Sequence, residues 1–156
     1  MSQTIKVNKT NKESNYTTLL YSFDIFDTLV TRTTATPCGI FSIIEKHLQK
    51  DYEYNNFPEI VKQNFSIIRQ EAENMVRANE RLMRNIQDIK FENIYEIIKD
   101  NYNLKEEQIT VLMNLELDTE IKNIVPIQKN INILKELIST GNRVILISDM
   151  YHNEKT

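Results

Sequence analysis

The sequence predicts an α/β protein in which a long helical segment interrupts a small parallel sheet. Two apolar runs rich in β-branched and aromatic residues, at 18–24 and 143–147, are typical of strands buried on both faces of such a sheet. Each run ends in polar side chains, with Asp24 after the first and Ser148 after the second. Residues 33–125 show helical periodicity and contain no convincing strand.

Apolar residues recur every three or four positions in five segments between the two runs, which predicts five amphipathic helices. The second helix opens at Pro58 and is so long that we expect a break between Ala78 and Asn85. Gly141 has the position and the residue type that end a helix before the last strand. The other four helices are expected at about 36–48, 91–102, 105–125 and 128–140.

Two groups of polar residues in the helical segment are interpreted as structural. Arg69, Glu73 and Arg77 are spaced four residues apart, and we interpret them as a solvated ladder of ion pairs rather than a substrate-facing surface. His47 lies on an apolar helix face, so we expect it in the core or at its boundary.

Composition and charge argue against several classes of partner. The chain has 156 residues, a net charge of -3 and interspersed acids and bases, so we expect no nucleic-acid surface. No apolar run reaches transmembrane length, and residues 1–17, expected to be a disordered arm, lack the apolar segment of a secretory signal. The single cysteine, Cys38, suits a reducing compartment, so a cytoplasmic location without a membrane partner is the default expectation.

The candidate site lies at the ends of the two apolar runs. Ligands of parallel sheets bind beyond the carboxyl ends of the strands, and two adjacent strands would bring Asp24 and Ser148 to the same edge. A carboxylate at that place has a large desolvation cost unless a metal, hydrogen-bond donors or chemistry compensate it. The pairing of these two residues is therefore the main functional signal in the sequence.

The residues around these positions resemble two motifs of the haloacid dehalogenase (HAD) superfamily. Asp24 followed by x-x-x-Thr28-Leu29 is similar to the first motif, and Ile145-Leu146-Ile147-Ser148 is similar to the second. The helical segment resembles the helical cap that the superfamily inserts directly after its first motif. The resemblance implies a partial Rossmann-like core of parallel strands in residues 18–32 and 126–156, with a helical cap in residues 33–125.

The resemblance also implies a phosphatase-type hydrolase that acts on a small phosphorylated metabolite. Asp24 would attack phosphorus and form an aspartyl-phosphate, which water would hydrolyse. Mg²⁺ would be held by the Asp24 carboxylate and by the backbone carbonyl of Phe26. The Ser148 hydroxyl would bind phosphoryl oxygens, and Thr28 would support the loop at the same phosphate site.

One departure from the family pattern concerns the acid/base residue. Phe26 occupies the position at which the phosphatases of the superfamily carry an acid/base aspartate, and Asp27 follows one residue later. Alternation along an extended chain would turn Asp27 to the opposite side, whereas a helical winding of the loop could bring it back. An aromatic residue at this position resembles the dehalogenase and phosphonatase branches, so dehalogenase-like hydrolysis at carbon is an alternative.

A second departure concerns the motifs that should follow Ser148. Lys155 lies too close to Ser148 to match the lysine of the third motif, and the acidic Mg²⁺ ligands of the fourth motif are absent. We therefore expect a truncated or partial chain that is weakly active or inactive alone, with the missing downstream part as a partner. The remaining alternative is a non-catalytic helical module that binds another protein and keeps the motifs only as structural remnants.

Overall fold

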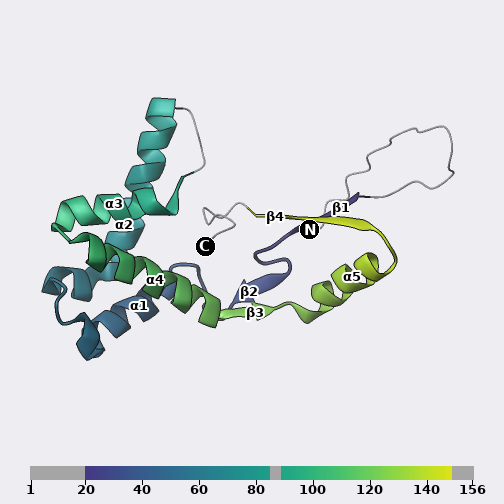
Figure 1. Cartoon of the computed structure of the whole chain (residues 1–156), viewed down its shortest axis with the longest axis horizontal. Helices are drawn as coiled ribbons and strands as arrows, with labels where there is room; N and C mark the ends of the chain where they lie inside the picture. The colour runs from purple at the N-terminus through teal and green to yellow at the C-terminus, as the bar shows by residue number, and fades with distance from the viewer. Residues whose placement is uncertain (1–19, 85–88, 149–156) are drawn as a thin grey trace. The chain divides into compact units, whose positions relative to one another are not determined.

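The computed structural model describes residues 20–84 and 89–148 of the chain (Figure 1). Contacts among these residues divide them into two compact units, which we call the strand unit (20–33 with 124–148) and the helical unit (34–84 with 89–123). The sequence analysis placed the helical segment at 33–125. The arm expected at 1–17 lies outside the described residues.

The strand unit contains a parallel sheet of two strands. β1 (Leu20–Asp24) pairs in parallel with β4 (Arg143–Ile147), so that Asp24 lies opposite Ile147. α5 (Gln128–Ser139) precedes β4 and packs against it. The predicted α/β class is confirmed as a mixed, mostly helical architecture with a small parallel sheet.

Gly141 follows the end of α5, as the sequence predicts. This glycine has φ +80°, a left-handed conformation that residues with a Cβ rarely adopt. Its N–H donates to the carbonyl of Ile138 at 3.0 Å, and the N–H of Asn142 donates to the carbonyl of Leu137 at 3.1 Å. The two bonds form a Schellman motif, which ends the helix and directs the chain into β4.

The expectation that both strands are buried on both faces is wrong: in β1, Leu20, Tyr21 and Ser22 are half-buried, and β4 contains no buried residue. Ile145, Leu146 and Ile147 are 42, 54 and 50 % exposed, whereas Phe23 of β1 is buried. Within the described residues, one helix and one neighbouring strand are too few to cover both faces of β4.

The sequence analysis missed an antiparallel strand pair in the strand unit. β2 (Val30–Arg32) pairs with β3 (Ile124–Pro126). The sequence predicts no strand at 30–32 and extends a helix over 124–125, because strands of three residues are too short to show a periodicity. Since β2 precedes the helical unit and β3 follows it, the insertion begins and ends at two neighbouring strands.

The helical unit has a single apolar core built from four helices. α1 (Gly39–Lys50) is followed by the 3₁₀ turn η1 (Tyr52–Tyr54), α2 (Glu59–Arg84), α3 (Phe91–Tyr102) and α4 (Glu106–Lys122). Most of the periodic apolar residues face inward, and the completely buried ones include Ile40, Ile44, Phe65, Ile94 and Leu112. Met75 and Leu82 of α2 belong to the same periodic pattern but are 47 and 82 % exposed. α4 ends at Lys122 rather than at 125, and Ile121 in its last turn, an apolar residue at helical spacing, is 68 % exposed.

α2 is one helix with a bend at a position that the sequence analysis did not identify. Asn64 has φ −132° and ψ 19°, and its side-chain amide donates to the carbonyl of Ile60 at 3.0 Å. Asparagine competes in this way with the backbone for a helical carbonyl, which favours a local distortion. The break expected between Ala78 and Asn85 is absent as far as Arg84, and the rest of that range lies outside the described residues.

A buried arginine of α2 contacts side chains of the other three helices of the helical unit. Arg69 of α2 is 0 % exposed, and its Nε and Nη2 each donate to one carboxylate oxygen of Glu116 in α4 at 2.8 Å. Tyr95 of α3 donates from its hydroxyl to Glu116 at 2.5 Å. The guanidinium also lies against three aromatic rings, those of Phe41, Phe91 and Tyr95.

The predicted ladder is thus right in its pairing and wrong in its solvation. Glu73 accepts hydrogen bonds from Arg69 at 3.0 Å and from Arg77 at 2.7 Å, as the spacing indicates. Arg77 is exposed, but Arg69 lies in the core. A desolvated guanidinium is stable only with compensating acceptors, and Glu116 supplies a bidentate one from 47 residues away.

The expectation for His47 is also wrong. Its side chain is 49 % exposed and its Nδ1 lies 2.7 Å from the carboxylate of Asp51, directly after α1. The other residues of the α1 apolar stripe, among them Ile44 and Leu48, are buried as expected. A polar ring at the edge of that stripe therefore turns to the surface and to a nearby carboxylate.

Replacing Arg69 by methionine should destabilise the protein by about 3–5 kcal/mol, because the substitution leaves the Glu116 carboxylate buried without its cation. Arg77→Met is the matched control, since it removes an exposed partner of Glu73 and should cost less than about 1 kcal/mol. Urea unfolding followed by circular dichroism measures both. Equal losses for the two variants would contradict the buried pair.

Candidate active site

The register of the parallel sheet places the two predicted functional residues at one edge. Asp24 is the last residue of β1 and lies opposite Ile147, the last residue of β4, which Ser148 follows directly. Both Asp24 and Ser148 are exposed. The edge at the carboxyl ends of the two strands thus carries a carboxylate and a hydroxyl.

The loop after Asp24 is wound rather than extended. The N–H groups of Leu29 and Val30 both donate to the carbonyl of Ile25, at 2.8 and 3.0 Å. The N–H of Asp27 donates to the carbonyl of Val30 at 2.7 Å, which closes the loop from the other side. Leu29 is buried and anchors this turn, so residues 25–29 have a defined conformation.

Thr28 connects this loop to the candidate nucleophile. Its hydroxyl donates to Oδ2 of Asp24 at 3.1 Å, across one turn of the chain. A hydrogen bond from this hydroxyl restricts the rotation of the carboxylate. This contact supports the predicted role of Thr28 in stabilising the loop, while its contact with a phosphate stays a prediction.

Two residues near the start of α5 donate hydrogen bonds to the loop of residues 25–29. The side-chain amide of Asn130 donates to the carbonyl of Thr28 at 2.7 Å, and the N–H of Ile127 donates to the carbonyl of Leu29 at 2.8 Å. The sequence analysis missed Asn130 because it lies 102 residues from Thr28 and belongs to no motif. The only feature of the sequence that could have indicated Asn130 is its position as a polar residue in the first turn of the helix before the last strand.

Asp27 also stabilises the loop of residues 25–29. It has φ +56°, a left-handed conformation that aspartate tolerates better than most residues. Its Oδ1 accepts a hydrogen bond from the hydroxyl of Thr31 at 3.0 Å. These contacts give Asp27 a structural role, and its role as an acid or base stays a prediction.

The positive charge of Arg32 lies over the ring of Phe26, next to the candidate site. The guanidinium of Arg32 in β2 lies 4.4 Å from the centre of the Phe26 ring, in the range of a cation–π contact. Phe26 forms an isolated bridge with Val30, which brings the two sides of the turn together. The sequence analysis did not select Arg32, since the six-residue separation from Phe26 reveals a contact only once the turn is known.

The described residues supply few ligands for a metal ion. Among residues 20–84 and 89–148, no three histidine, cysteine, aspartate or glutamate side chains lie close enough to share an ion. Asp24 and the carbonyl of Phe26 are oxygen donors of the kind that Mg²⁺ prefers. They fit an ion that takes its other oxygens from a phosphate and water, and they do not fit a cage made by protein alone.

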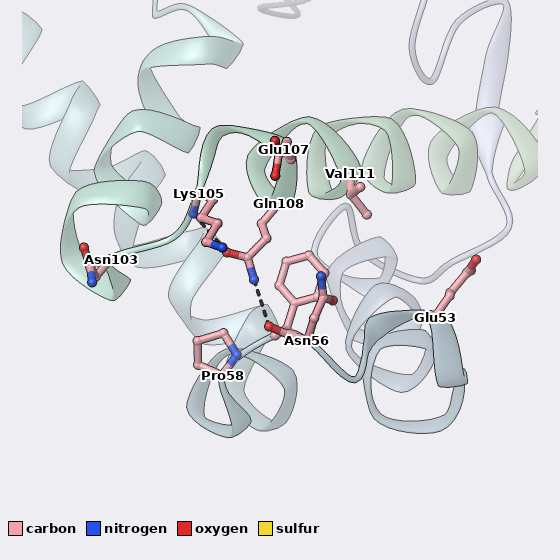
Figure 2. A pocket seen from close by; sticks show the side chains of 9 residues that line it. Glu53, Asn56, Pro58, Asn103, Lys105, Glu107, Gln108 and Val111 are labelled. Atoms are coloured by element: carbon pink, nitrogen blue, oxygen red, sulfur yellow. Dashed lines mark hydrogen bonds between the residues drawn. The ribbon is translucent and has the colours of Figure 1, made fainter.

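A hollow lies within the helical unit (Figure 2). It has a volume of about 390 Å³ and lies between the start of α4 and the segment that precedes α2. The Gln108 side chain crosses it, accepting from the N–H of Lys105 at 2.9 Å and donating to the carbonyl of Asn56 at 2.9 Å. Glu53 and Glu107 also line it, so the lining mixes both charges and indicates no single class of ligand.

No helix within the described residues is long and apolar enough to cross a membrane. Neither protein-family models nor curated proteins give a match to this chain. The roles assigned to Asp24, Thr28 and Ser148 therefore depend on the residues and geometry given above.

Asn130→Ala should lower the free energy of unfolding by about 1 kcal/mol, because the Thr28 carbonyl loses its side-chain donor. Asn132→Ala in the same helix is the matched control, since Asn132 contacts only exposed Gln128 among the hydrogen bonds known for it. Chemical denaturation followed by circular dichroism compares the two variants. A control that loses as much stability as Asn130→Ala would show that the loop contact contributes nothing specific.

Proposed function

We propose that this chain is a HAD-like hydrolase in which Asp24 attacks the phosphorus of a small phosphorylated metabolite. The observation that carries the proposal is the parallel register of β1 and β4, with Asp24 and Ser148 at the same edge. The Thr28 hydroxyl donates a hydrogen bond to Asp24 at 3.1 Å and orients the carboxylate.

The arrangement of the chain around the sheet supports the same class. A helix, α5, precedes the second parallel strand, as in a partial Rossmann-like core. The helical unit interrupts the strand unit between β2 and β3, which are neighbours. An insertion attached at two adjacent strands is suited to act as a helical cap that excludes water and selects the substrate.

The proposed reaction has two displacements at phosphorus. An Asp24 oxygen forms a bond to phosphorus while the bond from phosphorus to the leaving oxygen breaks, and that oxygen keeps the electron pair. Water then attacks the aspartyl-phosphate, which releases inorganic phosphate and restores the carboxylate. The Ser148 hydroxyl donates to phosphoryl oxygens, and Arg32, whose cation lies over the Phe26 ring, favours an anionic substrate nearby.

Mg²⁺ is proposed as the cofactor, with the Asp24 carboxylate and the Phe26 carbonyl as its ligands from the described residues. When bound, the ion offsets the repulsion between the anionic carboxylate and the anionic phosphate. Because this chain's described residues contribute a single carboxylate, the ion should bind much more weakly without phosphate than with it.

Phe26 determines which leaving groups fit the proposal. No carboxylic acid stands at this position to protonate the leaving oxygen or to activate water, and Asp27 is engaged with Thr31. A donor whose leaving group departs as an anion, such as an acyl phosphate, needs no proton at that step. We therefore expect the aspartyl-phosphate to form from such donors and to hydrolyse slowly.

Phe26 also favours a second candidate function, which is hydrolysis at carbon. There Asp24 would displace halide from a haloacid, forming an ester that water cleaves. Phe26 fits this reaction because a halide leaves without a proton, and the nearby Arg32 cation suits a carboxylate substrate. Halide release from a haloacid, lost in Asp24→Asn, would favour this candidate over phosphoryl transfer.

The wild-type chain, incubated with acetyl phosphate and Mg²⁺ and quenched in acid, should gain the mass of one phosphoryl group on Asp24. Asp24→Asn should abolish this gain, because an amide does not form the acyl-phosphate, and hydroxylamine should remove the label from the wild type. Asp27→Asn is the matched control and should still be labelled. Peptide mass spectrometry locates the modified residue.

Two outcomes would contradict the proposal. One is an unlabelled wild-type chain under conditions in which urea unfolding shows that it is folded. The other is a label that persists in Asp24→Asn. If haloacids also yield no halide, the non-catalytic interaction module is the remaining alternative.

A further inference from the structure

Hydrogen bonds connect the first turn of α5 to the carboxylate of Asp24 through Thr28. The side-chain amide of Asn130 donates to the Thr28 carbonyl at 2.7 Å, and the Thr28 hydroxyl donates to Oδ2 of Asp24 at 3.1 Å. Asn130 and Thr28 are half-buried, whereas Asp24 is exposed. The helix before the last strand is thus linked, through one residue, to the carboxylate that attacks phosphorus in the proposed reaction.

The two hydrogen bonds differ in how strongly water competes with them. The bond between Thr28 and Asp24 is exposed, so both groups can bind solvent instead, and the bond persists only if its donor is held in place. The bond from Asn130 to the Thr28 carbonyl is shorter and partly buried. It restrains the backbone from which the Thr28 hydroxyl projects.

The start of α5 holds two successive carbonyl groups of the loop. Because a peptide group is planar, a donor on the Thr28 carbonyl orients the whole group between Thr28 and Leu29. The carbonyl of Leu29 accepts from the N–H of Ile127 at 2.8 Å. This second bond uses only backbone atoms and remains when Asn130 is replaced. A substitution of Asn130 should therefore leave the loop folded and release only the restraint on Thr28.

Asn130 is suited to this task by its own environment. Its N–H donates to the carbonyl of Ile127 at 2.9 Å, which fixes its backbone in the first turn of α5. Its side chain is short, so little conformational entropy is lost when the amide is ordered. The amide is neutral and carries the hydrogen that a carbonyl partner requires.

We propose that Asn130 is a positioning residue for the nucleophile Asp24, and that it acts by holding Thr28. This inference rests on the function proposed above, because it assigns Asn130 a part in the attack on phosphorus. Asn130 donates to the Thr28 carbonyl rather than to Asp24. It should therefore affect how fast the carboxylate attacks, and not how tightly the phosphoryl donor binds.

The rate at which acetyl phosphate and Mg²⁺ label Asp24 measures this role. Asn130→Ala should lower the maximal labelling rate by about fivefold, which is the loss of one neutral hydrogen bond expressed as a rate. The acetyl phosphate concentration that gives half of the maximal rate should stay unchanged. Asn130→Asp should be at least as slow, because an ionised carboxylate has no hydrogen to donate. Circular dichroism gives the folded fraction, and rates are compared per folded molecule.

Gly141→Ala is the matched control for stability. Gly141 lies at the other end of α5 with φ +80°, and no atom lies within 4 Å of an added Cβ, so the substitution strains the backbone without a clash. It should destabilise the chain, as Asn130→Ala does, but leave the labelling rate per folded molecule unchanged. An equal slowing of both variants would show that the effect of Asn130 is only structural.

A double-variant cycle tests whether Asn130 acts through Thr28. Thr28→Val removes the hydroxyl that contacts Asp24 and keeps the carbonyl that Asn130 binds. Adding Asn130→Ala to Thr28→Val should cause little further slowing, because the connection to Asp24 is already broken. A further loss as large as in the wild-type background would show that Asn130 acts by another route.

The labelling experiment separates failure of this proposal from failure of the proposed function. A folded wild-type chain that is not labelled would remove the proposed function and, with it, the role of Asn130. A labelled wild type with an equally fast Asn130→Ala variant would leave the function standing and overturn the positioning role alone. A raised half-maximal concentration at an unchanged maximal rate would also overturn it, since Asn130 would then contribute to binding of the donor.

Discussion

The parallel pairing of β1 with β4 is the constraint on which the candidate site depends. Parallel strands cannot be joined by a tight turn, so the chain must leave the end of β1 and return to the beginning of β4. It returns through α5, whose Schellman motif at Gly141 directs it into β4. The carboxyl ends of both strands, and with them Asp24 and Ser148, then lie at the same edge.

The helical unit is held by interactions of its own. Its apolar core is continuous, and Arg69 fastens α2 to α4 through both oxygens of Glu116. These contacts lie within residues 34–123, and the paired strands β2 and β3 flank this segment in the sequence.

The sequence predicted those features that local patterns determine. The two apolar runs became β1 and β4, the periodic segments became helices, and Gly141 ended α5 as expected. Features that depend on distant partners could not be predicted, among them the burial of Arg69 against Glu116 and the hydrogen bond from Asn130 to Thr28. The strands β2 and β3 were missed because three residues are too few to show a period.

The most direct test of the account is a disulfide between the two strand ends. Neighbouring strands lie about 4.8 Å apart, within the range that a disulfide spans. In a Cys38→Ser background, Asp24→Cys with Ile147→Cys, the pair that lies directly opposite in the register, should cross-link within one chain under mild oxidation. Asp24→Cys with Arg143→Cys should not, since that pair lies at opposite ends of the sheet. Cross-linking of the second pair, or failure of the first in a folded chain, would contradict the parallel register and the site built on it.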